Sequence, residues 1–206
     1  MIHIERIVNR IFESNTFVVS FDDSKDIWLV DVGDTEKVID ILPVDCIVRG
    51  VFLTHTHFDH LYGINELYDK YPEIVVYVGE EGVKALYSAK KNLSKYHESP
   101  MEYRGTKVVT ISDGCSVELY PNVLLKAIAT PGHTPDSMSF LIGDKYLFTG
   151  DAYIPNAHVV SKLPGGNKAV AEHSQEYLIG LSCGRDLFPG HGNVLSIKDK
   201  VQQQYK

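Results

Sequence analysis

The chain has 206 residues, of which 44% are hydrophobic, and this suits one domain (residues 1–206) with an ordinary core. A net charge of −7 and a pI near 5.7 argue against a nucleic-acid-binding surface, which would need clustered Lys and Arg. We see no secretion signal near Met1 and no apolar run long enough to cross a bilayer, so we expect a cytoplasmic protein with neither nucleic acid nor membrane as its partner.

Predicted strands and helices alternate through the first half of the chain. The expected elements are, in order, strands at Asn15–Ser20 and Ile27–Val32, a helix at Thr35–Leu42, a buried strand at Cys46–Leu53, a helix at Asn65–Tyr71, a strand at Ile74–Val78 and a helix at Glu80–Lys90. A long polar loop is expected at Asn92–Thr106 on the surface, and it is a candidate to border a site. This alternation indicates an α/β fold.

The second half repeats the pattern with more strands. The expected elements are strands at Lys107–Ile111, Ser116–Leu119, Leu124–Ala129, Ser137–Ile142 and Lys145–Phe148, a helix at Lys168–Leu181 and a last short strand at Asp186–Phe188. No charge block or low-complexity segment separates the halves, which favours a single domain.

A dense group of metal-ligand residues follows the buried strand Cys46–Leu53. The segment Thr54–His60 contains His55, His57, Asp59 and His60 within six residues. Imidazole and carboxylate groups are the ligands that zinc and similar ions prefer. Side chains two positions apart in an extended segment share a side, so His55 and His57 should face the same way, and the turn that follows can bring Asp59 and His60 round beside them.

Three later loops have a common form, in which a strand ends, a Gly or Pro turn follows and a metal-type residue stands beside it. They are Thr130-Pro131-Gly132-His133, Thr149-Gly150-Asp151 and Pro189-Gly190-His191. Seven candidate ligands in this arrangement are hard to explain as unrelated surface residues.

This order of motifs resembles the metallo-β-lactamase superfamily, with its His-x-His-x-Asp-His motif and a later His, Asp and His. The resemblance runs from about Asn15 to Asn193. It implies a four-layer αββα sandwich with the site at one edge between two sheets. It also implies that His55, His57 and His133 hold one metal, that Asp59, His60 and His191 hold a second, and that Asp151 bridges the two.

The resemblance further implies two divalent ions, with zinc expected and iron or manganese as alternatives. A hydroxide between the two ions would attack an acyl carbonyl, and Asp59 would act as a catalytic residue that orients it and returns a proton to the leaving group. No Gly-x-Ser-x-Gly nucleophile motif competes with this reading. We therefore expect a metal-dependent hydrolase of a small ester or thioester.

Within the superfamily, Lys91–Ser94, Thr130–Ser137 and Phe148–Ala152 most resemble the glyoxalase II-like hydrolases, which cleave thioesters such as hydroxyacylglutathione. Only Gly192–Lys206 follow the last ligand, room for about one short helix. The helical segment with which glyoxalase II grips glutathione is therefore expected to be missing, and glutathione specificity with it.

Other activities stay open on this fold. A lactonase would differ in leaving group and pocket shape alone. An iron-dependent persulfide dioxygenase would use two His and one Asp, although Ala152–Asn156 does not match its Arg- and Cys-containing signature. A nuclease is disfavoured by the acidic charge, and a non-catalytic metal sensor by the full ligand set.

Two residues after Asp151 are candidates for substrate contact. Tyr153 could donate its hydroxyl to a substrate oxygen, or it could be an aromatic that packs at the rim. His158 could bind substrate or donate a proton, or it could be a solvated loop histidine.

Overall fold

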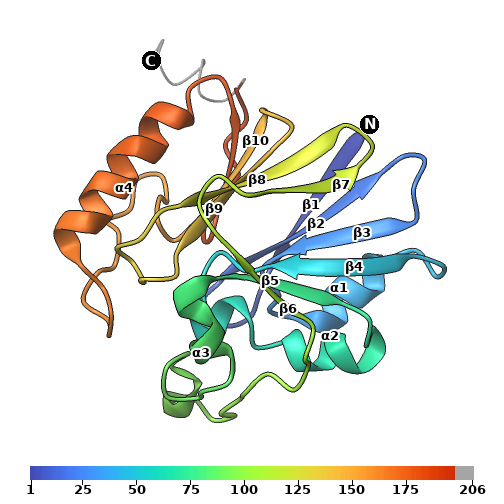
Figure 1. Cartoon of the computed structure of the whole chain (residues 1–206), viewed down its shortest axis with the longest axis horizontal. Coiled ribbons are helices and arrows are strands. Elements are labelled where there is room, and N and C mark those ends of the chain that lie inside the picture. The colour runs from blue at the N-terminus through green and yellow to red at the C-terminus, as the bar shows by residue number, and fades with distance from the viewer. Residues whose placement is uncertain (198–206) are drawn as a thin grey trace. The chain divides into compact units, whose positions relative to one another are not determined.

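The computed structural model describes residues 1–197, and its contacts divide the chain into two compact units, Met1–Ile111 and Ser112–Lys206. The short helix that the sequence allows after His191 falls largely on residues 198–206, outside the described part of the chain. Each unit contains one sheet with helices (Figure 1). Across residues 1–197, no helix is long and apolar enough to cross a lipid bilayer.

The sheet of the first unit has six strands in the order in which they occur in the sequence. They are β1 (Ile2–Val8), β2 (Asn15–Phe21), β3 (Asp26–Val30), β4 (Ile47–Phe52), β5 (Val75–Gly79) and β6 (Val108–Ile111). The pairs β1/β2 and β2/β3 are antiparallel, whereas β3, β4, β5 and β6 run parallel. The carboxyl ends of β3 and β4 therefore lie side by side, and this edge is where polar groups of α/β sheets meet.

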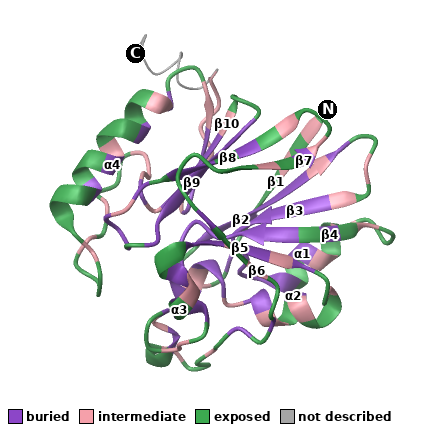
Figure 2. Cartoon of the chain, in the orientation of Figure 1, coloured by how far each residue is buried: buried purple, intermediate pink, exposed green. Residues whose placement is uncertain are grey.

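Two helices cover one face of this sheet, α1 (Thr35–Ile41) and α2 (Ile64–Lys70). Val38 of α1 and Leu67 of α2 are fully buried in one apolar cluster with Val51 of β4. Figure 2 shows that burial is concentrated in the strands, as β2 illustrates with six buried residues of seven. This core fixes the strand ends that carry the polar residues of the site.

One predicted helix is shorter than expected. The sequence predicts a helix over Glu80–Lys90, but the structure has a 3-10 turn at Glu80–Gly82 and one helical turn, α3, at Val83–Leu86. The carbonyl oxygen of Leu86 accepts a 2.8 Å hydrogen bond from the backbone N–H of Tyr103 instead of one from a further helical turn. The long loop expected at Asn92–Thr106 is present apart from a 3-10 turn at Ser94–Tyr96, and through Tyr103 it ends α3 early.

The second unit contains a five-stranded sheet in the order β11-β10-β9-β8-β7. Its strands are β7 (Ser116–Tyr120), β8 (Val123–Ala129), β9 (Met138–Ile142), β10 (Tyr146–Gly150) and β11 (Asp186–Pro189). Neighbours are antiparallel except β10 and β11, which run parallel. As a result β8, β10 and β11 all end at the same edge of this sheet.

The long helix of the second unit, α4, spans Lys168–Leu181 and confirms the predicted bounds. Asn167 caps its amino end, because the side-chain oxygen of Asn167 accepts a hydrogen bond from the backbone N–H of Val170. Leu178 anchors the helix in an apolar cluster with Leu147 of β10 and Leu187 of β11.

Candidate metal centre

In the first unit, three histidines gather on the loop that follows β4. His55, His57 and His60 are all buried. The ring centroid of His55 lies 4.8 Å from that of His57 and 4.3 Å from that of His60. Nε2 of His60 lies 3.3 Å from a carboxylate oxygen of Asp59. All four predicted ligands of this unit therefore belong to one compact group, which we call the unit 1 half-site.

A buried carboxylate, Asp31, orients two of these histidines. It stands directly after β3, and its carboxylate accepts hydrogen bonds from His60 Nδ1 at 2.9 Å and from the backbone N–H and hydroxyl of Thr54 at 2.7 and 2.8 Å. Since the Thr54 hydroxyl gives its proton to Asp31, it accepts from Nδ1 of His55, 3.1 Å away. Both rings thus carry their proton on Nδ1 and their lone pair on Nε2, so Nε2 is the atom of each ring that can bind a metal.

Asp31 is a residue that the sequence analysis missed, because the predicted strand Ile27–Val32 ran through it. The observed strand β3 ends at Val30, and Asp31 adopts the left-handed backbone conformation with φ 57°. Burial raises the pKa of Asp31, and the hydrogen bonds from His60 and Thr54 act in the opposite direction. The signal available in the sequence was an acidic residue near the end of an apolar predicted strand.

A second buried carboxylate, Asp34, lies directly before α1 and is held by the side chains of Arg10, Lys37 and Tyr62. Burial alone would raise its pKa, but hydrogen bonds from Lys37, Tyr62 and Arg10 outweigh this and lower the pKa to about 2. Nζ of Lys37 and Nε of Arg10 lie 2.8 and 2.9 Å from its oxygens. Asp34 therefore stays ionised across the physiological pH range.

The loop between β1 and β2 holds the backbone of Asp59 in place. The hydroxyl of Ser14 donates to the carbonyl oxygen of Asp59 at 2.7 Å, and Asn9 in turn donates to Ser14 at 3.0 Å. Asn9 also accepts from the backbone N–H of Asp34 at 2.9 Å. A continuous network of hydrogen bonds therefore links the backbone N–H of Asp34 to the segment that carries Asp59.

The long loop also reaches the unit 1 half-site, which the sequence analysis left open. The ring of His97 lies 4.6 Å from the ring of Phe58, the residue between His57 and Asp59, and Phe12 contacts the same histidine at 5.6 Å. His97 therefore belongs to an aromatic group beside the predicted ligands.

In the second unit, the three predicted ligands follow the strands that end at one edge. Oδ2 of Asp151 lies 3.5 Å from Nε2 of His133 and 3.5 Å from Nε2 of His191. The carboxylate of Asp151 thus stands between two imidazoles. We call these three residues the unit 2 half-site.

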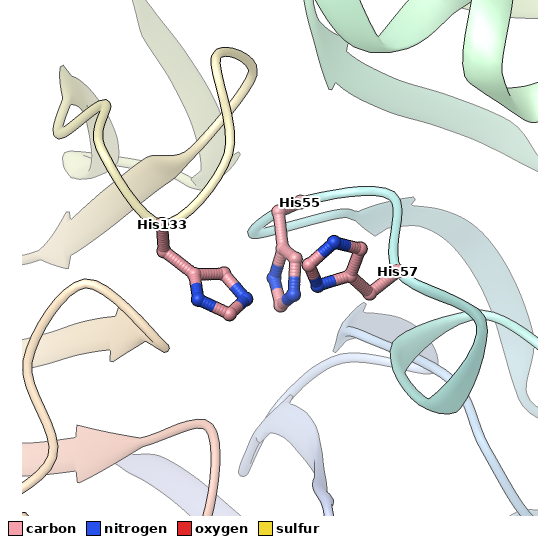
Figure 3. Close-up of side chains that lie close together, drawn as sticks. All are labelled: His55, His57 and His133. Atoms are coloured by element: carbon pink, nitrogen blue, oxygen red, sulfur yellow. The ribbon is translucent and has the colours of Figure 1, made fainter. Parts of the chain in front are cut away.

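The ring of His133 is oriented by a backbone carbonyl. Its Nδ1 lies 2.6 Å from the carbonyl oxygen of Val160, which can only accept, so Nδ1 carries the proton and Nε2 the lone pair. Figure 3 shows His133 projecting from the loop after β8, and His55 and His57 projecting from the loop after β4. The sequence analysis missed Val160, because nothing in the sequence distinguishes one backbone carbonyl from another.

A close contact with α4 fixes the loop that carries His133. Gly132 has φ +128°, and a Cβ there would lie 2.2 Å from the backbone nitrogen of Ala171 in α4. The hydroxyl of Ser174 also donates to the carbonyl oxygen of Pro131 at 2.7 Å. The helix therefore sets the position of this loop.

The Gly132→Ala variant should be clearly less stable than the matched control variant Gly114→Ala. At Gly114, where φ is +77° and no atom stands within 4 Å of an added Cβ, alanine should cost about 1 kcal/mol of backbone strain. At Gly132 the clash with Ala171 should add about 1–3 kcal/mol. Urea unfolding of the metal-free variants measures both values, and equal losses at the two positions would contradict this view of the loop.

The remaining candidates have different surroundings. Tyr153 is partly buried and packs against the apolar cluster of the second unit, and burial raises its pKa. His158 is exposed and lines a cavity beside α4. Ser137, which was not a predicted site residue, bonds to the hydroxyl and backbone N–H of Thr134 and so shapes the turn around His133.

The donor set of the two half-sites fits a divalent metal ion. All seven predicted residues offer a ligand atom of the kind that binds zinc, iron or manganese, and in three of the histidines an oxygen acceptor places the lone pair on Nε2. The described residues thus contain His and Asp groups that could bind metal.

The sequence is similar to those of a thioesterase and of hydroxyacylglutathione hydrolases. The chain is 31% identical over 164 residues to the atrochrysone carboxyl ACP thioesterase of Aspergillus fumigatus, covering 76% of this chain and 42% of that protein. It is 26% identical to a hydroxyacylglutathione hydrolase of Buchnera aphidicola, covering 96% of this chain and 77% of the relative. The chain thus spans less than half the length of the first relative and about three quarters of the second.

The comparisons confirm both the fold type and the family that the sequence predicts. The crystal structure of BLEG-1, a B3 metallo-β-lactamase, matches with a TM-score of 0.86 at 23% identity over 97% of both chains, which confirms the expected α/β fold of this type. The family model described as the metallo-beta-lactamase superfamily matches residues 12–191. This match covers most of the chain and all seven predicted ligands, and the chain therefore belongs to the metallo-β-lactamase superfamily.

Proposed function

We propose that this protein is a dinuclear metal-dependent hydrolase that cleaves a small thioester or ester. The observation that carries the proposal is the pair of half-sites, in which imidazoles are held by oxygen acceptors with their lone pairs on Nε2. The names of two relatives, an ACP thioesterase and a hydroxyacylglutathione hydrolase, support acyl transfer to water as the reaction.

We propose that the two half-sites hold two ions jointly. His55, His57 and His133 would bind one ion, Asp59, His60 and His191 the other, and Asp151 both. Zinc is the ion proposed. Two such ions supply a water of lowered pKa and polarise the carbonyl oxygen of the substrate.

The protein's own groups would direct the proton. Asp59 stands at the unit 1 half-site, with its backbone fixed by Ser14, so its carboxylate can hold the proton that water releases. The water oxygen bonds to the acyl carbon, the carbon–sulfur bond breaks, and the proton passes from Asp59 to the departing thiolate. No side-chain nucleophile takes part.

Removal of the metal should abolish turnover. We expect the purified protein to contain two equivalents of zinc, to lose hydrolysis of acyl thioesters after chelation, and to regain it when zinc is restored. Metal quantification and a panel of thioesters, esters and lactones measure this. Turnover that survives complete metal removal would reject the mechanism, and one iron with oxygen uptake on a persulfide would assign a dioxygenase instead.

A further inference from the structure

A tight turn in the first unit presents three lysines to solvent. Residues 89–95 follow α3 (Figure 1), and the backbone N–H of Lys95 closes the turn by donating to the carbonyl oxygen of Ala89 at 2.8 Å. Lys90, Lys91 and Lys95 are all exposed. We call residues 89–95 the lysine turn.

Two buried side chains hold the lysine turn in one shape. Oδ1 of Asn92 accepts from the backbone N–H of Ser94 at 2.9 Å, and Nδ2 of Asn92 donates to the carbonyl oxygen of Met101 at 3.0 Å. The hydroxyl of Ser94 accepts from the backbone N–H of Met101 at 2.9 Å. These bonds keep Leu93 in the left-handed conformation, with φ 67°. The lysines therefore project from a fixed backbone, which reduces the entropy that is lost when a partner binds.

The lysine turn has an excess of positive charge. Within residues 1–197, none of its three lysines forms an ion pair, whereas Lys107 of the same unit pairs with Glu73. Residues 82–107 contain six Lys and Arg and only two Glu, although the whole chain has a net charge of −7. One of these two, Glu102, has a carboxylate oxygen 3.3 Å from the backbone N–H of Ala89 and offsets part of the charge. The remaining excess favours a negatively charged partner, because salt screens charges more than about 10 Å away.

Two exposed aromatic side chains stand beside the lysine turn. Tyr96 follows Lys95 directly and is 70% exposed. Phe12 is 65% exposed, and its ring centroid lies 5.6 Å from that of His97, the residue after Tyr96. Aromatic residues are enriched in protein–protein interfaces, and charged residues surround them there as a rim. A nucleic acid would instead require cations along a longer track of the surface. The combination favours an acidic protein as the partner.

The same loop reaches the unit 1 half-site. The ring of His97, two residues after Lys95, lies 4.6 Å from the ring of Phe58. Phe58 stands between the predicted ligands His57 and Asp59. A partner at the lysine turn is therefore held beside the segment that carries these ligands.

We propose that the lysine turn and the side chains of Tyr96 and Phe12 form a docking surface for an acidic protein. Carboxylates of the partner pair with the three lysines, and an apolar side chain of the partner packs on the two aromatic rings. The inference goes beyond the proposed reaction and does not depend on it, because no residue of this surface is a proposed metal ligand or catalytic residue.

The experiment measures binding of a fluorescein-labelled amphipathic peptide rich in Glu and Leu to the chelated protein, by fluorescence anisotropy. A triple variant that replaces the lysines of the turn should bind the peptide about tenfold more weakly than the parent, since each exposed ion pair contributes little by itself. Tyr96→Ser should also weaken binding, and this loss should persist at high salt, where the ion pairs are screened. The triple variant is Lys90→Gln/Lys91→Gln/Lys95→Gln.

The matched control removes the same charge at three exposed lysines elsewhere, and it should bind the peptide as the parent does. Urea unfolding of all variants checks that each is folded. The control variant is Lys70→Gln/Lys126→Gln/Lys162→Gln.

Three results would overturn the inference. The first is no binding of the acidic peptide by the parent, and the second is an equal loss in the triple variant and the control. The third is lysine-dependent binding of single-stranded RNA or of phosphatidylserine vesicles that is tighter than binding of the peptide, which would assign the surface to nucleic acid or to a membrane. Because binding is measured without metal, failure of thioester hydrolysis would leave this inference standing.

Discussion

Replacing Asp151 with alanine should remove both metal ions and lower turnover by at least about a hundredfold. Its carboxylate oxygen stands 3.5 Å from Nε2 of His133 and of His191, and it is the one residue proposed to touch both ions. Loss of a group that only orients a ligand already costs about 10–100-fold in metal affinity, so loss of a bridging ligand should cost more. Metal quantification after dialysis and kcat/KM on a thioester measure the two effects.

The control for this variant is His173→Ala. His173 is exposed on α4 and outside both half-sites, so its loss should leave metal content and turnover nearly unchanged. If the Asp151→Ala protein lost only one of two equivalents, Asp151 would not bridge the ions. If it matched the parent in both metal and activity, the assignment of the site would be wrong.

Replacing Asp31 with alanine should destabilise the protein and weaken metal binding together. The variant leaves the N–H and hydroxyl of Thr54 and Nδ1–H of His60 without their buried acceptor. We expect a loss of about 3–5 kcal/mol in the free energy of unfolding and about 10–100-fold weaker metal binding. Urea unfolding of the metal-free protein and competition with a chromophoric chelator measure these values.

Asp31→Asn separates the two effects, because an amide keeps the shape and offers one acceptor oxygen and one donor group. The NH2 group of the asparagine would then face at least one of the three donors that the Asp31 carboxylate now accepts from. Metal binding should therefore still fall, while the free energy of unfolding falls less than in Asp31→Ala. Asp40→Ala, on the exposed side of α1, should change stability by no more than about 0.5 kcal/mol. Metal affinity equal to that of the parent in both Asp31 variants would exclude the orienting role.

Much of the fold and the ligand positions could be predicted from local pattern. Alternation of apolar residues located most strands, and α4 begins and ends at the predicted residues. The later ligands stood out because each follows a strand and a Gly or Pro turn, as His133 and Asp151 do. Hydrophobic period and turn chemistry are properties of neighbouring residues, so a single sequence displays them.

What could not be predicted depends on groups far apart in the chain. The helix expected over Glu80–Lys90 stops at Leu86 because its carbonyl bonds to Tyr103, seventeen residues later. Asp31 meets His60 because β3 and β4 are parallel neighbours, and no local pattern states which strands pair. The carbonyl of Val160 is still harder to foresee, since every residue has one.

The left-handed backbone at Asp31 limits what evolution or a designer can place there. A φ of 57° is comfortable for glycine, asparagine and aspartate and costs most other residues about 1–2 kcal/mol. Of those three residues, glycine has no side-chain acceptor, and asparagine has one acceptor oxygen where aspartate has two. The backbone conformation therefore restricts the residue type, and the hydrogen bonds then select aspartate. Position 31 must therefore tolerate a positive φ and also provide acceptors for His60 and Thr54. We expect almost every substitution there to be deleterious.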